Sequence, residues 1–142
     1  FLGVKISKVA CGAQFTAALT SDGEVWCWGE GGCGQLGCGR VTKLDSPRLA
    51  AHADLPTGGG GFSGIACGWA HCLAVASESG EIYSWGLNAH GQLGHGDLKS
   101  RFEPQRIQSV QSTPFKFVSA GDHYSSALER DLPQATVLEP LF

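Results

Sequence analysis

Two pairs of potential metal ligands flank two copies of the tetrapeptide Gly-Gln-Leu-Gly. Cys33 and Cys38 flank the first copy, and His90 and His95 flank the second. Two thiolates and two imidazoles would be sufficient for a tetrahedral zinc site. Such a site requires all four side chains to converge on bonds of about 2.3 Å, and equivalent loops of neighbouring repeats lie too far apart for this. We therefore predict no metal site and keep zinc only as an alternative.

The six cysteines indicate no disulfide framework when the chain is compared with itself. Cys11 and Cys67 occupy equivalent positions in two similar segments, whereas the other four each align with a different residue type. Cys72, for example, aligns with Thr16. With no secretory signal in the sequence, we expect reduced thiols and an intracellular protein, in the cytoplasm or the nucleus.

The composition is that of an ordinary globular protein, with 42% hydrophobic and 16% charged residues. The 21 glycines among 142 residues indicate frequent turns. No apolar run approaches the roughly 18 residues that a membrane helix needs, so we expect no membrane insertion. A net charge of −3 provides no global attraction to nucleic acid. Because the sequence starts at Phe1 and contains no methionine, we expect it to be part of a longer chain.

The chain repeats itself, and a repeat of this kind determines the fold. Val9–Gly12 recurs as Ile65–Gly68 and again as Val118–Gly121, at steps of 56 and 53 residues. Further along, Gly23–Gly29 matches Gly80–Gly86 at a step of 57, and the two Gly-Gln-Leu-Gly segments match at the same step. Three copies of one unit therefore begin within the sequence.

Within each copy the apolar residues alternate with period two, which is typical of short β-strands. Phe15, Ala17 and Leu19 form one such series. The dipeptides Asp22-Gly23 and Ser79-Gly80 lie between two alternating runs, which predicts a hairpin in each copy. No segment has an apolar period of 3.6 residues long enough for a helix, so we predict an all-β fold.

The order C-G-x-x-H-T-x-x-L, D-G-x-V-x-x-W-G, G-Q-L-G-x-G and proline resembles the repeat of the regulator of chromosome condensation family. The second copy is nearly complete, with Cys67, Gly68, His71, Gly80, Trp85, Gly86, Gly91, Gln92, Leu93, Gly94, His95, Gly96 and Pro104. The resemblance implies a seven-bladed propeller in which each blade takes strands from two consecutive repeats. With about two and a half repeats, the chain is predicted to be a partial β-propeller with unpaired strand edges at both ends.

We divide the chain at the limits of these units. Repeat 1 covers residues 1–54, a Gly-rich connection 55–61, repeat 2 residues 62–114, the start of repeat 3 residues 115–130, and a tail that abandons the pattern residues 131–142. Trp28 and Trp85 recur at one repeat position and are predicted to pack between blades.

The loop after the first strand of each repeat is the leading candidate for partner binding. The resemblance places these loops on one rim of the propeller, where exchange factors of the family engage their GTPase. The candidate residues are Gln14, Trp69, His71, Asp122 and His123. For His71 the alternative is a structural role, because the family histidine commonly hydrogen-bonds backbone between blades.

Trp69 has a further interpretation. Residues 68–72 (Gly-Trp-Ala-His-Cys) resemble the tryptophan motif of the plant UV-B photoreceptor. Ala70 stands where that motif has arginine, and repeats 1 and 3 carry Ala13 and Asp122 in place of tryptophan. Light sensing is therefore kept only as an alternative.

Basic residues gather in the loops that follow Gly-x-Gly in repeats 1 and 2. They are Arg40, Lys43, Arg48, Lys99, Arg101 and Arg106. On a ring, equivalent loops share an edge, so these residues form a possible basic stripe for phosphates or an acidic protein. Asp45, Asp97 and Glu103 lie among them, which favours solvated loop charge instead.

We find no nucleophile paired with a base, no repeated carboxylate pair and no cofactor motif, so we expect neither enzymatic activity nor a cofactor. The predicted function is a protein-protein interaction scaffold that binds partners through its rim loops. One alternative is guanine-nucleotide exchange on a Ran-like small GTPase. A second alternative is a structural subunit, with the remaining blades in the same longer chain or in another chain. Nucleic acid is not expected as a partner.

Overall fold

The computed structural model describes residues 3–50, 60–110 and 113–130, which form ten strands and one short helical turn. The first eight strands are β1 (Ile6–Cys11), β2 (Phe15–Thr20), β3 (Val25–Glu30), β4 (Lys43–Leu49), β5 (Phe62–Cys67), β6 (His71–Ala76), β7 (Ile82–Gly86) and β8 (Arg101–Arg106). A 3-10 turn (Gln108–Val110) then leads to β9 (Phe115–Ala120) and β10 (Ser125–Glu129). The described residues contain no helix long and apolar enough to span a bilayer.

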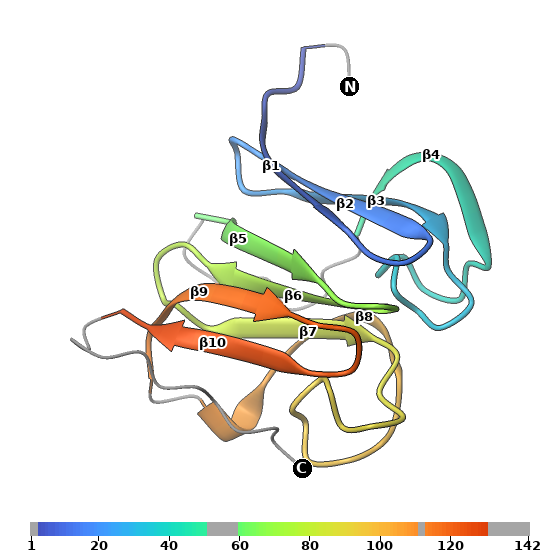
Figure 1. The fold of residues 1–142 in the computed structure, drawn as a ribbon. Coiled ribbons are helices and arrows are strands. Elements are labelled where there is room, and N and C mark those ends of the chain that lie inside the picture. Colours follow the sequence, from blue (N-terminus) through green and yellow to red (C-terminus); the bar gives the residue numbers. More distant parts are fainter. Residues whose placement is uncertain (1–2, 51–59, 111–112, 131–142) are drawn as a thin grey trace.

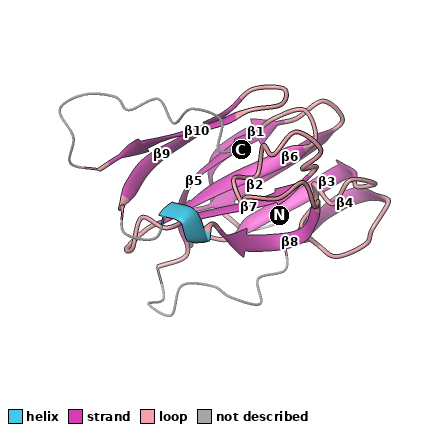
Figure 2. Cartoon of the chain, turned by 90° about the horizontal axis from the view of Figure 1, so that it is seen from below, coloured by secondary structure: helices cyan, strands magenta, loops and turns pink. Residues whose placement is uncertain are grey.

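The strands form three antiparallel sheets in chain order (Figure 1). β1-β2-β3-β4 make blade 1, β5-β6-β7-β8 make blade 2, and β9 and β10 make a two-stranded hairpin. Figure 2 shows the three sheets from below, with the helical turn between β8 and β9 along the chain. The prediction of an all-β partial propeller is confirmed. Residues 51–59, which include most of the predicted connection, lie outside the described residues. The same is true of the whole predicted tail, residues 131–142.

The hairpin turns form where the glycines were expected to permit them. Gly23 and Gly80 have φ values of +84° and +70°, a region that other residues seldom adopt. Each turn also touches the first strand of the next sheet, because Phe62 N–H donates to Gly23 O at 2.8 Å and Phe115 N–H donates to Gly80 O at 2.9 Å. The same turn therefore closes a hairpin and links one sheet to the following one.

The largest apolar cluster lies between blades 1 and 2. Leu19 and Val25 of blade 1 and Ile65 and Trp85 of blade 2 are all at most 2% exposed within it. Trp28, the counterpart of Trp85, is partly buried and packs against the same cluster. A second cluster joins blade 2 to the β9–β10 hairpin. The sheets are held together mainly by side chains from their facing surfaces, which is how propeller blades bury their apolar area.

The two Gly-Gln-Leu-Gly loops share one construction. In each, the glutamine side-chain oxygen accepts a backbone N–H at 2.9 Å, from Cys33 to Gln35 and from His90 to Gln92. Each loop turns its leucine into the core, where Leu36 and Leu93 are at most 1% exposed. In each loop the backbone carbonyl of the glutamine accepts a side-chain hydrogen bond from the neighbouring sheet, Gln35 O from Trp85 Nε1 and Gln92 O from Ser125 Oγ.

Candidate binding site at the rim loops

Three rim loops connect the first two strands of each sheet, and they are joined to one another by backbone hydrogen bonds. Ala13 N–H donates to Trp69 O at 3.1 Å, and Trp69 N–H donates to Asp122 O at 3.2 Å. The loops therefore form one continuous band across blade 1, blade 2 and the β9–β10 hairpin. A band fixed in this way loses little conformational entropy when a partner binds.

Glycine is required at the base of each loop, because the Cβ of any other residue would collide with neighbouring atoms. A Cβ at Gly68 would lie 2.0 Å from His71 Cε1 and 2.4 Å from Gly121 O. A Cβ at Gly12 would lie 2.0 Å from Phe15 Cε1. The recurrence of glycine at this position follows from the close approach of neighbouring loops.

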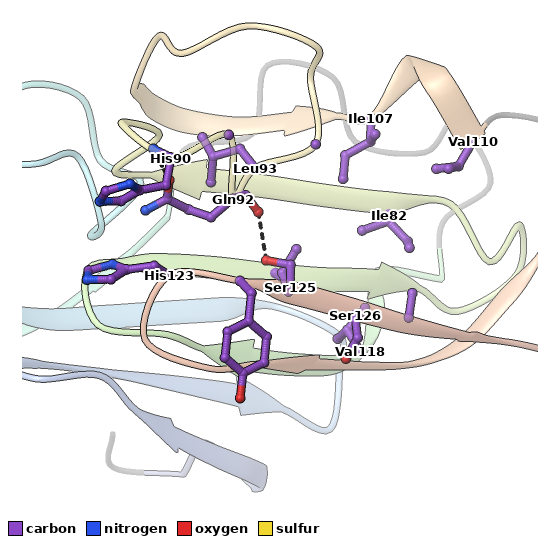
Figure 3. Close-up of a pocket in the computed structure, with 15 residues that line it drawn as sticks. Ile82, His90, Gln92, Leu93, Ile107, Val110, Val118, His123, Ser125 and Ser126 are labelled. Carbon is purple, nitrogen blue, oxygen red and sulfur yellow. Dashed lines mark hydrogen bonds between the residues drawn. The ribbon is translucent and has the colours of Figure 1, made fainter. Parts of the chain in front are cut away.

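The exposed surface of the band carries an aromatic group made of Trp69, His123 and His90. Trp69 is 49% exposed, and its ring centroid lies 6.2 Å from that of His123. The rings of His123 and His90 are 4.7 Å apart, and Figure 3 shows them side by side at one end of a pocket. His90 comes from the Gly-Gln-Leu-Gly loop of blade 2, so the band and that loop share one surface. Sequence reasoning assigned no partner-binding role to His90, because nothing in the repeat places it beside His123.

Gln14 lies on the same band, on the side of blade 1. It lines a depression together with Trp69, Glu30 and Cys33. Asp122 and His123 are exposed on the other side of Trp69. Four of the five predicted residues thus belong to one surface.

His71 is the exception, because it is fully buried beneath the band. Its Nε2 lies 3.0 Å from Ser125 Oγ, and Ser125 Oγ donates to Gln92 O at 2.7 Å. Burial lowers the pKa of His71 to about 4, so the ring is neutral at physiological pH. These contacts fit the structural alternative, in which the histidine ties blade 2 to the next hairpin.

Two serine–histidine contacts resemble part of a catalytic triad, but in both the hydrogen bond runs in the direction opposite to the one that catalysis needs. Ser125 Oγ contacts His71, and Ser84 Oγ lies 3.0 Å from His95 Nε2. Each hydroxyl donates its proton to a backbone carbonyl, that of Gln92 or that of Leu93. The imidazole must then donate to the serine oxygen, and it cannot act as a base toward that hydroxyl.

Three of the four residues of the alternative zinc site have separate surroundings. The Cys38 thiol lies 3.2 Å from Leu36 O, His95 contacts Ser84, and His90 contacts His123. In the part of the chain that the structure describes, no three or more His, Cys, Asp or Glu side chains gather as a metal site would require.

The predicted basic stripe is largely occupied by interactions within the protein. Arg101 Nη2 lies 2.8 Å from Asp97 Oδ2, and the hydrogen bonds from Arg101 hold the pKa of Asp97 well below its usual range. Arg106 pairs with Glu81 at 2.6 Å. Lys43 pairs with Asp45 at 3.4 Å, and Arg40 stacks on the Phe102 ring at 4.2 Å. Of the six basic residues, Arg48 and Lys99 alone lack such a side-chain partner among residues 3–50, 60–110 and 113–130.

A pocket between blade 2 and the β9–β10 hairpin was not predicted (Figure 3). The pocket is partly open to solvent, and its lining is mostly apolar. Leu93 and Ile107 come from blade 2, and Val118 and Ala127 come from the hairpin. The signal that could have revealed it is the repeat itself, because Leu93 and Ile107 are the counterparts of Leu36 and Ala50 in the filled interface between blades 1 and 2.

Stacked four-stranded antiparallel sheets, joined by recurring rim loops, define a segment of a β-propeller built from sequence repeats. Residues 22–75 and 79–128 match the regulator of chromosome condensation (RCC1) repeat, and a second description of that repeat matches residues 6–35 and 62–92. The chain belongs to the RCC1 repeat family. Blade 2 takes β5 and β6 from the first of the two longer matches and β7 and β8 from the second, as the resemblance implied.

Three known proteins are similar to this chain over most of its length. The ultraviolet-B receptor UVR8 of Arabidopsis thaliana is 40% identical over 131 residues, which is 92% of this chain and 29% of the receptor. Human WBSCR16 superimposes with a TM-score of 0.78 and 28% identity, over 92% of this chain and 33% of that structure. Prp20p of Saccharomyces cerevisiae gives a TM-score of 0.77 at 23% identity, over 91% and 32%. The chain spans about a third of the length of each of these proteins.

Proposed function

We propose that the rim band formed by Gln14, Trp69, Asp122 and His123 is a binding surface for a protein partner, and that the protein is an interaction scaffold. The observation that carries the proposal is the pair of backbone hydrogen bonds that hold Trp69 between Ala13 and Asp122. They present a half-exposed tryptophan on a fixed backbone. Tryptophan is the residue type most enriched at the energetic centres of protein interfaces.

The chemistry of the band indicates what a partner must supply. Trp69 and His123 provide an aromatic platform, and Asp122 adds a negative charge beside it. A lysine or arginine of the partner, set over the Trp69 ring and near the Asp122 carboxylate, would combine a cation–π contact with an ion pair. We therefore favour a partner that inserts a basic residue between apolar neighbours.

A small GTPase and the histones are the first partners to test. The structure of Prp20p is described together with its binding to Gsp1p and histones, and histones are rich in basic residues. Purified Ran-like GTPase and core histones should be tested separately against the 142-residue chain and against any longer protein that contains it. Release of a fluorescent guanine nucleotide from the GTPase distinguishes exchange activity, our second candidate function, from simple binding.

Substitutions in the band test whether it is the surface used. Trp69→Ala should weaken partner binding at least tenfold, as expected for a central aromatic residue, and Trp69→Phe should weaken it less. Leu98→Ala is the matched control, because Leu98 is also exposed, at 67%, and lies outside the band. Equal partner affinity for the wild type and Trp69→Ala, measured by calorimetry, would place binding elsewhere and reject the proposal.

A further inference from the structure

The rim loop that carries Trp69 has a thiol on each side of its base. Cys67 is the last residue of β5, Cys72 lies in β6, and the two residues are directly opposite each other in a cross-strand pair. Their sulfur atoms are 3.3 Å apart. The four residues between them, Gly68–His71, contain the loop that presents Trp69 on the rim band. The thiol pair is therefore the base of the loop that carries the central residue of the proposed binding surface.

The equivalent pairs at the other two rim loops contain at most one sulfur atom. In blade 1 the pair is Cys11 and Thr16. In the β9–β10 hairpin the pair is Ala120 and Ser125. Neither pair can be oxidised to a disulfide. Of the three rim loops, the one with two opposed thiols is also the one that carries a tryptophan.

The two thiols differ in exposure, and this sets the order in which they react. Cys67 is partly exposed, whereas Cys72 is 1% exposed. Burial raises the pKa of Cys72, and contacts with the thiols of Cys27 and Cys67 raise it further, so Cys72 stays protonated. An oxidant therefore reaches the sulfur of Cys67 first, and the thiol of Cys72 is in position to react with the product.

A hydroperoxide such as hydrogen peroxide would oxidise this pair in two steps. The Cys67 sulfur takes one oxygen atom from the peroxide and becomes a sulfenic acid, and one water is released. The Cys72 sulfur then attacks the Cys67 sulfur, and the hydroxyl group leaves with the thiol proton of Cys72 as a second water. Two thiols and one peroxide thus give one disulfide and two waters. A dithiol reductant reverses the change by thiol–disulfide exchange.

Formation of the disulfide would change the shape of the base of the loop. The two sulfur atoms must approach from 3.3 Å to about 2.05 Å. Gly68 N–H donates to His71 O at 2.9 Å, so the adjacent pair of cysteines is of the non-hydrogen-bonded kind, with Cα atoms about 4.5 Å apart. Most disulfides have Cα separations of about 5.5–6 Å. We therefore expect the bond to spread the two strand ends.

The loop is held by its neighbours and has little room to accommodate this movement. A Cβ at Gly68 would lie 2.4 Å from Gly121 O, so the Gly68 backbone already approaches the next loop closely. Trp69 N–H donates to Asp122 O at 3.2 Å, and Trp69 O accepts from Ala13 N–H at 3.1 Å. Both distances are at the long end of the range for such hydrogen bonds. A shift of the loop should lengthen these two bonds first.

We propose that Cys67 and Cys72 are a redox switch for the rim band: a hydroperoxide joins them, the loop between them shifts, and its hydrogen bonds to the neighbouring loops weaken. The reduced protein is the form with an ordered band, and the oxidised protein is the form with a loosened band. The effect on a partner rests on the proposed function, whereas the shift of the loop does not. The loop has blade 1 on one side and the β9–β10 hairpin on the other, so its contacts are formed within this chain.

The test uses the 142-residue chain with serine in place of the three cysteines outside the cluster of Cys27, Cys67 and Cys72. The replacements are Cys11→Ser, Cys33→Ser and Cys38→Ser. One equivalent of hydrogen peroxide should lower the mass by about 2 Da, the mass of two hydrogens. Chymotrypsin cleaves after Trp69, between the two cysteines, so a peptide map should show their two peptides linked. Cys72→Thr in the same chain is the matched control, because Thr16 is the natural counterpart of Cys72, and it should form no bond.

Amide hydrogen exchange of the ¹⁵N-labelled protein measures the shift of the loop. The amide hydrogens of Ala13 and Trp69 should exchange with solvent about tenfold faster after oxidation and return to their first rates with dithiothreitol. Ala13 lies in blade 1, so its response reports on the contact between loops and not on the nearby sulfur atoms. Glu30 N–H, which donates to Gln14 O at 2.8 Å within blade 1, is the internal control and should keep its rate.

Partner binding is measured separately, with core histones and with a Ran-like GTPase as probes. After the peroxide has been removed, a probe that binds the reduced protein should bind the oxidised protein about fivefold more weakly, as expected for the loss of one hydrogen bond. Dithiothreitol should restore the affinity. The Cys72→Thr chain should bind equally well before and after peroxide treatment.

Three results would overturn the proposal. They are a disulfide that joins Cys72 to Cys27 or no disulfide at all, unchanged exchange of the Ala13 and Trp69 amides once the expected bond has formed, and equal affinity of a probe for the reduced and oxidised proteins. If neither probe binds the reduced protein, the proposed function fails for these partners. The exchange rates then decide whether the switch exists.

Discussion

Trp85 donates its indole N–H to the backbone carbonyl of Gln35, a residue 50 positions earlier in the chain, at 3.0 Å. This bond joins the central part of blade 2 to the Gly-Gln-Leu-Gly loop of blade 1. The indole also fills the space above Gly37 and Ala50. Trp85 thus makes both a hydrophobic contact and a hydrogen bond between the two blades.

Replacement of Trp85 should be among the most destabilising changes in the protein. Trp85→Ala should lower the free energy of unfolding by about 3–5 kcal/mol, because it leaves a cavity in a packed interface. Trp85→Phe should cost about 1–2 kcal/mol, mainly from the lost hydrogen bond at Gln35. Urea unfolding followed by circular dichroism measures both values. Trp69→Ala is the control for removal of an indole, and it should change stability by less than about 0.5 kcal/mol because Trp69 lies on the surface.

Gly68→Ala should distort the rim band without any change in charge. The new methyl group would meet His71 and the Gly121 carbonyl, and the carbonyl is backbone that cannot move aside freely. We expect a loss of about 1–3 kcal/mol in unfolding free energy, together with weaker partner binding at the band. Gly32→Ala is the matched control, since a Cβ there meets nothing within 4 Å. Similar unfolding curves for the two variants would contradict the close approach seen at Gly68.

Stability should fall as the solution is acidified through the range in which an unfolded histidine gains a proton. The pKa of His71 is lowered from 6.5 to about 4 in the folded protein, so the unfolded chain takes up the proton first. The stabilisation is complete above pH 6.5 and is lost progressively as pH falls toward 4. Between pH 7 and pH 5 the loss from His71 should be about 2 kcal/mol.

The variant His71→Phe isolates this effect, because Phe15 is the natural counterpart of His71 in the first repeat. Its unfolding free energy should vary less with pH over the same range. Burial also lowers the pKa of His95, so a smaller dependence of the same sign should remain. An unchanged pH profile in His71→Phe would show that His71 does not titrate as expected.

Mild oxidation should join Cys67 to Cys72. The two residues are opposite each other in a cross-strand pair of β5 and β6, and their sulfur atoms are 3.3 Å apart. Gly68 N–H donates to His71 O, so the adjacent pair 67/72 is of the non-hydrogen-bonded kind, whose Cα separation of about 4.5 Å is within the range of disulfides. Diamide would take up the two thiol hydrogens and leave a disulfide, detected as a mass decrease of about 2 Da, the mass of two hydrogens, and mapped by digestion.

Cys67→Ser is the control for this reaction. It should prevent the bond between β5 and β6 and leave unfolding of the reduced protein nearly unchanged. Cys72 also contacts the thiol of Cys27, which lies in β3 of blade 1. A peptide map of the oxidised wild type in which Cys72 is linked to Cys27 instead of Cys67 would contradict the prediction.

The repeat made most of the fold predictable. Asp22-Gly23 and Ser79-Gly80 predict hairpin turns because only a few backbone conformations reverse a strand in so few residues, and the structure has a turn at each. The burial of Trp85 could likewise be predicted, since a large aromatic residue at a repeated position has few roles other than packing. Side chains whose partners come from another repeat were harder to assign.

His71 and Arg101 show why the candidate sites were less predictable than the fold. The two roles considered for His71 could not be separated until its burial and its contact with Ser125, 54 residues away, were seen. Arg101 belonged to a predicted basic stripe, yet its guanidinium group is held by Asp97 four residues earlier. Residue type and spacing do not determine which of several nearby charges a long side chain selects.

By itself the sequence determined the class of fold, the order of the strands and the positions of the turns, because these depend on short-range alternation and on glycine at repeated sites. Tertiary structure alone decided which loops touch. It brought His90 of blade 2 beside His123 of the next hairpin, and it formed a pocket at Gln92, whereas Trp85 covers the equivalent Gln35 of blade 1. Contacts between sheets depend on the rotation and separation of whole blades, which no local pattern of residues specifies.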